Sequence, residues 1–569
     1  MFGFHIADFV VLILYFIGVT GVGIWSAKKV KNMGDYFMPR SFGKGALIMH
    51  AFGTGTHSDQ AVGVASKTFS SGLSGIWYQW LWLFVTPFYW LIAPVLRRFR
   101  AITMADVFVA RYDNSVGILY AVVGMLQLMV NIGLMLKGSS VIISATFGDA
   151  ISPSTIIAIM TGLFLIYGIA GGLSAAIVTD FIQGILTVIF SFLLLPFVMN
   201  AVGGMKGLHE SITNPEMFSL IAPAEIGIFY IVIIALNGLV GIVTQPHTMG
   251  NCAAGRTEMD GRVGFTVGNF IKRICTIVWS LTGLAAVAYL VGNDVEPDKV
   301  YGIMARDFLP QIMPGLLGIF LASLLASVMS SCDSFMVASS ALFTENIYRP
   351  LMSKKSSNHY LMVGRITALF IVAGGVSFAF WLPGVVKGLE IFWKISPMMG
   401  IVFWLGLFWR RTTVTAAWAA TFSAFFMWWL TTQSGFITFV AGFPMAETLR
   451  FIFVKNGIME IYLPWQMVFY LTTGVIAGIV VSFFTKPVNE DQLDSFYALS
   501  RTPVEKDEVL NDEPCTLPNG AMTPAPNRLF KSKNIEILKP SKISLLGFGL
   551  SWVFVAGLVG CVFYIAGIN

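Results

Sequence analysis

The sequence predicts an all-α protein that crosses a membrane about fourteen times. The chain has 569 residues, of which 56% are hydrophobic and 12% are charged. That charged share is about half of what a typical soluble domain carries. Apolar runs of about 20 residues recur along the whole length, and such runs match the thickness of a bilayer. Helices of this length satisfy their own backbone groups inside lipid, so the class is helical and polytopic.

Fourteen segments have this character: 7–27, 45–66, 73–96, 115–147, 153–171, 174–202, 226–249, 265–292, 315–346, 360–382, 389–409, 412–433, 463–485 and 543–567. The connections on one side of them carry seventeen Lys and Arg residues and those on the other side carry six, leaving the long segment 489–542 aside. Basic residues concentrate in cytoplasmic loops. We therefore expect the first side to be cytoplasmic and both termini to lie outside. The net charge of +6 then reflects membrane orientation, and no nucleic-acid partner is expected.

The remaining segments offer no room for a soluble catalytic or signalling domain. Residues 7–27 are followed, not preceded, by basic residues, which is typical of a retained span and not of a cleaved signal peptide. Residues 486–542 are polar and contain several prolines, so we expect a mostly disordered cytoplasmic linker. Residues 434–462 form an outer loop with some apolar content. The five Cys residues form no metal-type pair and imply no disulfide framework.

The span at 315–346 carries hydroxyl groups and a carboxylate. Ser323, Ser327, Ser330 and Ser334 are spaced four, three and four apart, so they share one helical face, with Asp333 beside it. An unpaired carboxylate at that depth costs at least about 2.5 kcal/mol. Each Ser could bond to the carbonyl four residues earlier, but that would not account for the Asp. Hard cations prefer oxygen ligands, so the pattern indicates a cation site.

Two spans are interrupted by polar, Gly or Pro residues, at 52–60 (FGTGTHSDQ) and at 237–247 (NGLVGIVTQPH). They lie five spans apart. Interrupted helices at corresponding positions of two halves point to a transporter built from inverted repeats. Unwound backbone frees carbonyls that can bind cations, and it is tolerated where it lines a cavity. Close helix packing at Gly is the alternative explanation for either span alone.

Four motifs, taken in order, resemble the sodium/solute symporter family, which includes sodium-coupled sugar, proline, pantothenate, choline and sialic-acid carriers. They are residues 171–175 (GGLSA) with Asp180, 245–247 (QPH), 326–331 (ASVMSS) running on to 344–348 (TENIY), and 405–412 (LGLFWRRT). The resemblance implies a LeuT-type inverted-repeat core at 45–409, with repeat one at 45–202 and repeat two at 226–409. Residues 1–44 would then form an extra span and loop. Residues 410–485 would add further spans, 486–542 the linker, and 543–569 the last span.

Carried over by position, the resemblance implies a main sodium site. It would consist of the carbonyls of Gly53, Thr56 and Ser327 and the hydroxyls of Ser330 and Ser331. A second sodium ion, bound by some members, would use Asp180, Asp333, Ser330 and Ser334. Two nearby carboxylates repel each other unless a cation lies between them or one holds a proton. We therefore favour two sodium ions per cycle. The alternative is a protonated carboxyl or a bond to Lys137.

For the solute, the resemblance to the sugar carriers implies contacts from Gln60, Gln79, Asn237 and Lys272, with His57 beside the break. Amides donate and accept, which suits hydroxyl groups. Gln79 replaces an acidic residue of the sugar branch and Val240 replaces its tyrosine, while residues 245–247 look more like the proline branch. Lys272 and Arg273 could also be interfacial anchors.

The expected function is sodium-coupled import of a small polar organic solute across the plasma membrane by alternating access. A sugar or polyol is favoured, and an amino acid of the proline type or a carboxylate is the alternative. A sodium-dependent sensor or channel on the same fold is the alternative from another class. An enzyme is not expected, because no HExxH or GxSxG motif lies on a span. Sodium, the solute and lipid are the expected partners, with no obligatory protein partner.

Overall fold

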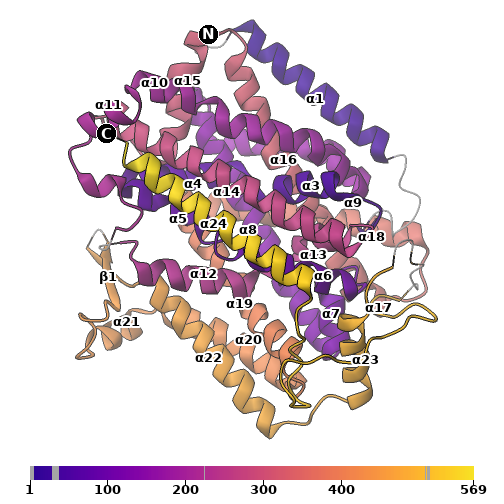
Figure 1. Ribbon diagram of the computed structural model, residues 1–569. Helices are drawn as coiled ribbons and strands as arrows, with labels where there is room; N and C mark the ends of the chain where they lie inside the picture. Colours follow the sequence, from indigo (N-terminus) through magenta and orange to yellow (C-terminus); the bar gives the residue numbers. More distant parts are fainter. Residues whose placement is uncertain are drawn as a thin grey trace.

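The computed structural model describes residues 5–27, 37–222, 225–455, 457–505, 508 and 513–568. Within these residues the protein is almost entirely helical, and its one sheet is the two-stranded hairpin of β1 (Ile452–Lys455) and β2 (Ile458–Ile461). The hairpin is antiparallel and pairs Ile452 with Ile461. Helices from distant parts of the chain pack into one body, with the first and last helices on its outer surface (Figure 1).

The helices of the first half are α1 (Ile6–Ala27), α3 (Lys44–Gly55), α4 (Ser58–Ser71), α5 (Trp77–Trp80), α6 (Thr86–Arg98), α7 (Met104–Arg111), α8 (Asn114–Thr146), α9 (Pro153–Leu193), α10 (Leu195–Ala201), α11 (Gly204–Ser211), α12 (Ile228–Ile242), α13 (Pro246–Ala253) and α14 (Glu258–Tyr289). Those of the second half are α15 (Val300–Ile312), α16 (Leu316–Phe343), α17 (Arg349–Leu351), α18 (Ser357–Trp381), α19 (Val385–Phe408), α20 (Val414–Leu430), α21 (Ser434–Ala441), α22 (Leu463–Phe484), α23 (Glu490–Arg501) and α24 (Lys542–Ala566). Short 3₁₀ turns, η1 (Gly72–Ile76), η2 (Pro215–Phe218) and η3 (Pro297–Lys299), and the π-helical turn η4 (Thr344–Tyr348) complete the set.

By length and apolar composition, eight helical segments of the described residues can each cross a membrane, or ten when two bent pairs count as one span each. The predicted number of fourteen is not confirmed. The four predicted spans outside this set are 7–27, 45–66, 73–96 and 153–171. The second is split into α3 and α4, and the third is divided among η1, α5 and α6. The residues of these short or interrupted helices are mostly buried, whereas α1 and the start of α9 carry exposed apolar side chains.

The chain reverses direction within α9, which contains the predicted span 153–171 and the first part, 174–193, of the span predicted at 174–202. A straight helix of 41 residues would be about 60 Å long. Asp149, just before α9, accepts a bond of 2.9 Å from Lys299, while Tyr301, two residues further on, lies 3.5 Å from the carbonyl of Phe190 near the end of α9. Both ends of α9 therefore lie beside the start of α15. This reversal sends residues 176–193 back into the core next to α16.

The two interrupted spans are confirmed as breaks in helices. Between α3 and α4, Thr56 and His57 adopt extended backbone conformations. Between α12 and α13 the direction changes by 69°, with Pro246 opening the second half. Proline is suited to a first helical turn because it has no N–H to leave unpaired. Each break leaves helix ends in the interior instead of at the membrane surface.

The helix that carries the Ser stripe lies at the centre. In the apolar stretch of α16 that could cross a membrane, 94% of the residues are buried inside the protein, and the corresponding share for α14 is 83%. The shares for α18, α22 and α24 are 33%, 28% and 22%, so these helices cover the outside. α16 packs most closely on α9, and α3 lies between α9 and α14. The sodium-site candidates on α3 and α16 therefore sit in the core.

Residues 486–542 are expected from the sequence to be mostly disordered, but their described part has a defined structure. It forms α23 and returns along one end of the molecule, which we call the linker side (Figure 1). Arg410 bonds Glu490, Asp494 and Glu536 at 2.6–2.9 Å. Phe496 is buried and stacks on Phe99 with ring centroids 5.2 Å apart. The polar, proline-containing composition concealed one apolar face of α23, and that face docks on the helix ends.

Candidate functional site

The predicted main sodium site brings together the end of α3 and the middle of α16. The Ser331 hydroxyl donates to the carbonyl of Gly53 at 3.1 Å and lies 3.3 Å from the carbonyl of Thr54. It also lies 3.3 Å from the carbonyl of Ser327, one turn earlier on α16. The carbonyls of Gly53 and Thr54 belong to the last turn of α3, where intrahelical partners run out. The structure thus gathers Gly53, Ser327 and Ser331 around one point.

Ser330 reaches the same region from the adjacent face of α16. Its hydroxyl donates to Oδ1 of Asp180 at 2.5 Å. A Cβ on Gly53 would lie 2.7 Å from the Ser330 hydroxyl oxygen, so only glycine permits this approach. Thr56 ends α3, and its buried hydroxyl has no hydrogen-bond partner among the described residues. All five predicted ligands lie at the junction of α3 and α16, and their oxygens suit a hard cation.

The predicted second site is divided by the structure. Asp180 is bonded to Ser330 and also to Nδ1 of His50, at 2.5 Å. Ser334 lies 3.3 Å from the Thr54 hydroxyl. Asp333 lies one turn after Met329, whose sulfur accepts a bond from the Tyr15 hydroxyl of α1 at 3.6 Å. Asp333 also interacts electrostatically with the Tyr15 phenol. Asp180 and Ser330 are therefore adjacent, whereas Asp333 lies toward α1.

His50 was not singled out from the sequence. It lies on α3, one turn before Thr54, and its ring is buried between Asp180 and the Thr54 hydroxyl, which is 3.3 Å away. A histidine in an apolar stretch offers no periodic signal in a single sequence. Its role depends on α9 presenting Asp180 to it across the core.

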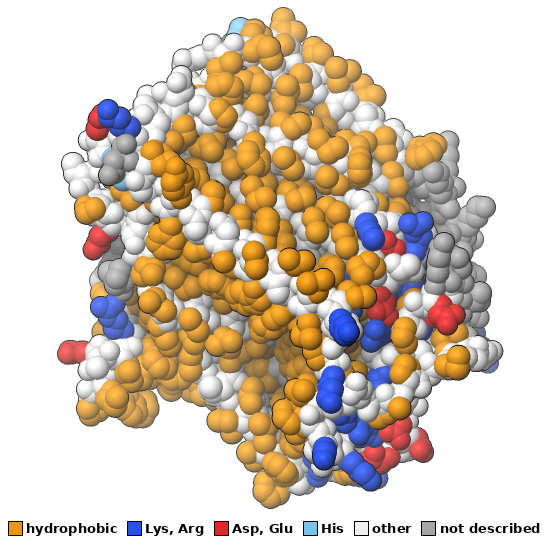
Figure 2. Space-filling model, in the orientation of Figure 1, with side chains coloured by type: hydrophobic (Ala, Val, Ile, Leu, Met, Phe, Trp, Pro, Cys, Tyr) orange, Lys and Arg blue, Asp and Glu red, His pale blue; other side chains and the backbone are white. Residues whose placement is uncertain are grey.

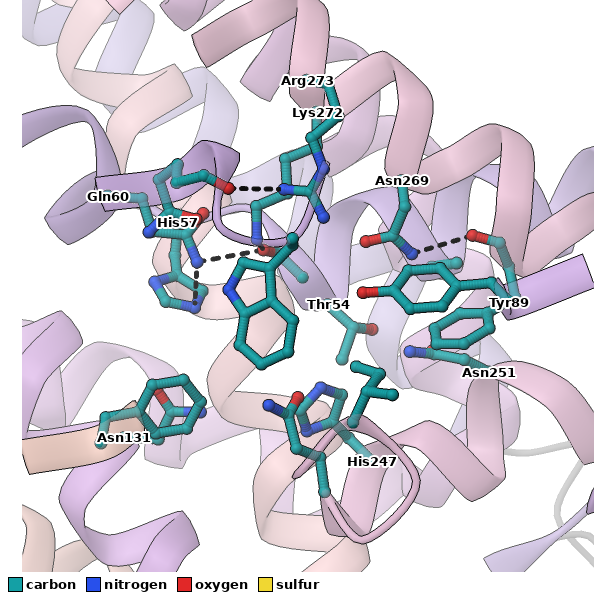
Figure 3. Close-up of a pocket in the computed structure, with 18 of the residues that line it drawn as sticks. Thr54, His57, Gln60, Tyr89, Asn131, His247, Asn251, Asn269, Lys272 and Arg273 are labelled. Carbon is teal, nitrogen blue, oxygen red and sulfur yellow. Dashed lines mark hydrogen bonds between the residues drawn. The ribbon is translucent and has the colours of Figure 1, made fainter. Parts of the chain in front are cut away.

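A cavity opens beside the break between α3 and α4. It lies among α3, α4, α5, α6, α8, α13, α14, α16 and α19, and Figure 3 shows its polar side chains. The lining comprises Ala51, Thr54, Gly55, His57, Gln60, Gln79, Trp82, Tyr89, Asn131, Ile242, Gln245, His247, Asn251, Phe265, Asn269, Lys272, Arg273, Phe335, Leu389, Phe392 and Trp393. Four of the five predicted solute contacts are in this lining. They are His57, Gln60, Gln79 and Lys272.

The fifth, Asn237, lies outside the lining. It is buried on α12, where its amide donates to the carbonyl of Trp393 at 2.9 Å and its oxygen accepts a bond from Tyr470. Both of its polar atoms are thus used to join α12 to α19 and α22. Trp393 lines the cavity, so Asn237 supports the wall from behind.

Two of the predicted solute contacts, Lys272 and Gln60, bond to the backbone at the end of α3. The carbonyl of Gly55, left free where α3 ends, accepts a bond from the Lys272 ammonium and one of 3.1 Å from the Gln60 amide (Figure 3). A cation is favourable at a helix C-terminus because the macrodipole is negative there. The Gln60 amide also lies 3.1 Å from Nε2 of His57, whose other ring nitrogen is paired with Asp59. These contacts give Lys272 and His57 structural partners at the cavity wall.

Several buried acceptors in the lining have no hydrogen-bond partner among the described residues. They are the amide oxygens of Gln60, Gln79, Asn131 and Asn251 and Nδ1 of His247. Buried polar atoms are normally paired, and an unmade hydrogen bond costs about 1–3 kcal/mol. The atoms therefore mark where a ligand with hydrogen-bond donors would be held.

Sequence reasoning missed Asn131, Asn251 and Asn269, and it considered Arg273 only as an interfacial anchor. Asn269 and Arg273 lie one turn apart on α14, beside Lys272, and the polar face they form was a detectable signal. Asn251 follows His247 by one turn on α13. Asn131 lies inside the long apolar helix α8, and only tertiary packing shows that it faces the cavity.

A second cavity lies between this site and the linker side. Its lining includes His50, Thr54, Ser334, His247 and Thr103. Thr54 and His247 line both cavities, so these two side chains form the wall between them. The sodium-site junction therefore borders a space that continues toward Thr103, at the start of α7.

Comparisons with known proteins agree with this arrangement. A model of the sodium:solute symporter family matches residues 36–423. The chain is 28% identical over 476 residues to sodium/glucose cotransporter 2 of Rattus norvegicus, covering 72% of this chain and 69% of that protein. It is 26% identical over 499 residues to the osmoregulated proline transporter OpuE of Bacillus subtilis (strain 168), covering 83% of this chain and 94% of that protein.

Among solved structures, a Na⁺-coupled sialic acid symporter in a substrate-bound outward-open state superposes with a TM-score of 0.68 at 19% identity, covering 85% of this chain and 99% of that one. This likeness confirms the expected LeuT-type fold. The family model spans more than half of the chain, including both interrupted helices and the stripe on α16. The protein is therefore an integral membrane transporter that uses sodium, and it belongs to the sodium:solute symporter family.

Proposed function

We propose that this symporter imports a small polyhydroxylated solute, a sugar or polyol, together with sodium. The observation that carries this proposal is the set of unpaired amide oxygens on Gln60, Gln79, Asn131 and Asn251. Hydroxyl groups can donate to such oxygens and accept from the same amides. Trp82 and Trp393 add flat apolar faces to the same wall.

A solute with a carboxylate, such as a proline-type amino acid, is the second candidate. Lys272 and Arg273 both line the cavity, and no Asp or Glu is among the described lining residues. The sequence likeness to OpuE also favours this candidate. Against it, Lys272 is bonded to the Gly55 carbonyl, and Arg273 lies 3.3 Å from the carbonyl of Gln79 and from the Thr86 hydroxyl.

A thermal-shift screen in sodium and in potassium should identify the solute class, because only a ligand of the folded state raises the melting temperature. Sugars, polyols, amino acids and sugar acids form the panel. We expect sodium-dependent stabilisation by a neutral polyhydroxy compound. Stabilisation by amino acids alone would overturn the proposal in favour of the second candidate.

Counterflow of the labelled hit in proteoliposomes then tests transport itself. A carrier exchanges solute across a sealed membrane, whereas a sodium-dependent sensor or channel would not accumulate label. Asn131→Leu should raise the solute concentration for half-maximal uptake about fivefold to tenfold, the effect of losing one hydrogen bond of about 1–1.4 kcal/mol. Gln127→Leu is the matched control. Gln127 is buried one turn earlier on α8 and is absent from the lining.

We further propose that one sodium ion is carried per cycle, at the junction of α3 and α16. Both oxygens of Asp180 already accept bonds, from His50 and from Ser330, and Asp333 lies toward Tyr15. The Asp180 carboxylate is close enough to balance the charge of an ion held by Ser330 and Ser331. A sodium-to-solute flux ratio of one, unchanged in Asp333→Asn, is the expected result. A ratio of two would restore the second site.

The ion would couple the two ligands because it contacts the half-helix that also borders the solute. Gly53 lies on the last turn of α3, and Gly55 at its end lines the solute cavity. Sodium would thus hold α3 and α16 in the arrangement that completes the solute site. Sodium and the solute then both bind more tightly to the same conformation, which is sufficient to couple them. The second cavity offers the release route.

The linker side is proposed to be cytoplasmic and the membrane to be the plasma membrane, with both termini outside. The excess of basic residues on that side supports this orientation. An inside-negative potential would then favour sodium entry by about 2.3 kcal/mol per 100 mV. The orientation is tested by labelling Met522→Cys and Gly457→Cys with an impermeant reagent on intact cells, each in a variant whose five native Cys residues are replaced by Ser. Labelling is expected only at position 457.

A further inference from the structure

A large apolar cleft lies on the outer surface, separate from the solute cavity. It has a volume of about 810 Å³ and is bounded by α6, α12, α19, α22 and residues 536–541 before α24. None of the residues that line it lines the solute cavity. Figure 2 shows this side of the molecule, where hydrophobic side chains surround a hollow between α24 and α22.

The walls of the cleft are suited to hydrocarbon. Leu91 and Val95 of α6, Leu239 of α12, Trp404 of α19 and Val475 of α22 are among the residues that form them. Each of these side chains is only partly buried by the protein. The cleft runs along membrane-crossing helices, so lipid chains and not water are the neighbouring solvent. A polar solute would gain no hydrogen bonds from these walls.

The end of the cleft on the linker side is basic. Arg262 of α14 lines it with only 7% of its surface exposed. One of its nitrogens donates to the Ser544 hydroxyl at 3.1 Å, and the guanidinium lies 5.7 Å from the Trp90 ring centroid. Lys539 lines the same end and is exposed. In the part of the chain that the structure describes, neither side chain has a carboxylate within ion-pair distance.

Two acidic groups lie near this end, and both are already used. Glu536, which lines the cleft, accepts bonds from Arg410 and Arg528. Glu258, one turn before Arg262 on α14, forms a bidentate pair with Arg98 at 2.7 and 2.9 Å. Arg262 therefore keeps most of its five N–H donors available beside an apolar space. A largely buried guanidinium is costly unless an anion and hydrogen bonds compensate it. Arg262, Lys539 and the hydroxyls of Ser541 and Ser544 form a phosphate-sized set of donors at the mouth of the cleft.

We propose that this cleft is a binding site for an anionic phospholipid. The phosphate lies against Arg262, Lys539 and Ser544, and the acyl chains lie along α6, α19 and α22. The basic mouth and the apolar walls are complementary to the two parts of that molecule. The lipid comes from the leaflet on the linker side, which is the cytoplasmic leaflet if the proposed orientation holds. The site itself is independent of which solute is transported.

Native mass spectrometry of the purified full-length chain tests the proposal, with dioleoyl phosphatidylglycerol as the probe and dioleoyl phosphatidylcholine for comparison. We expect one tightly retained phosphatidylglycerol, and at least tenfold weaker retention of phosphatidylcholine. Arg262→Gln and Lys539→Gln should each weaken phosphatidylglycerol retention by about tenfold. Arg365→Gln is the control, because Arg365 is an exposed cation on α18 away from the cleft. Inorganic phosphate at equal concentration should not bind.

The apolar half is tested by filling the cleft. Val475→Trp should abolish retention of the lipid, whereas Ile476→Trp should not, since Ile476 is 61% exposed on the same helix and does not line the cleft. The proposal is overturned if both Trp variants retain lipid equally, if both lipids bind alike, or if only detergent is bound. Cross-links between Val475→Cys positions of two copies would also overturn it, because a second chain would then occupy the cleft. Thermal melting of each variant confirms that it is folded.

Discussion

Gly53 lies so close to the Ser330 hydroxyl in the proposed sodium site that Gly53→Ala has a well-defined expected effect. A Cβ at position 53 would lie 2.7 Å from the Ser330 hydroxyl oxygen and 3.7 and 3.8 Å from Cβ and Cγ of Asp180. The first distance is too short for a real contact, and Asp180 leaves no room behind. The Ser330 hydroxyl must therefore rotate away, which removes one proposed sodium ligand and its bond to Asp180.

The size of the effect follows from that bond. A hydrogen bond to a charged group is worth about 1.5–3 kcal/mol, so displacing the hydroxyl should weaken sodium binding about tenfold to hundredfold. Helix propensity acts in the opposite direction on stability, because Ala replaces Gly in a helix with a gain of about 0.5–1 kcal/mol. The lost bond to Asp180 outweighs this gain, so the variant should melt at a lower temperature without sodium and respond to sodium only at much higher concentrations.

The assay is the rise of the melting temperature with sodium concentration, measured without solute at constant ionic strength. Gly45→Ala is the matched control. Gly45 lies on the same helix, and an added Cβ there meets nothing within 4 Å. If Gly53→Ala and Gly45→Ala show the same sodium dependence as the parent, the assignment of Gly53 and Ser330 to the sodium site is refuted.

Three other outcomes test neighbouring parts of the structure. Ser331→Ala should raise the half-saturating sodium concentration about tenfold, because the hydroxyl that bridges α3 and α16 is lost; an unchanged titration would contradict its role. His50→Ala should make the sodium dependence steeper, with the Hill coefficient rising above one, because Oδ2 of Asp180 becomes available to a second ion; a coefficient that stays at one would argue against His50 as the group that occupies this carboxylate. Burial raises the pKa of Glu536, but the bonds from Arg528 and Arg410 together lower it by more, so its pKa lies below the usual 4.5. Docking of the linker should therefore be complete above pH 4.5, weaken as the pH falls through the lowered value, and be lost at neutral pH in Glu536→Gln, as measured by proteolysis of residues 486–542.

Much of the site on α16 could be predicted because its signal is local. Hydroxyls at helical spacing and a glycine-rich break are visible in one sequence, and both lie where expected. For the predicted second site, the neighbours of its two carboxylates could not be predicted from the sequence. Asp180 and Asp333 are both at depth, but the rotation of α16 against α9 and α1 decides which neighbour each carboxylate meets. That rotation depends on packing among three helices from distant parts of the chain.

The solute cavity shows the same limit. His57, Gln60, Gln79 and Lys272 line it, as expected, because they lie near the break or on polar faces. Asn237 has the same chemistry but is placed behind the wall, where Trp393 and Tyr470 use its amide. Asn131 was concealed in an apolar helix. A side chain that is polar and buried can serve a ligand or a neighbouring helix, and only its surroundings distinguish the two.

The sequence by itself determined the membrane class, the two broken helices and the oxygen-rich face of α16, because hydropathy, Gly and Pro act within a few residues. Tertiary structure decided which carboxylate meets His50, which amides remain unpaired in the cavity, and that α23 docks on the helix ends. It also created the apolar cleft beside Arg262, whose walls come from four helices and the linker. These features depend on surfaces that meet only when distant segments pack, and no local pattern encodes them.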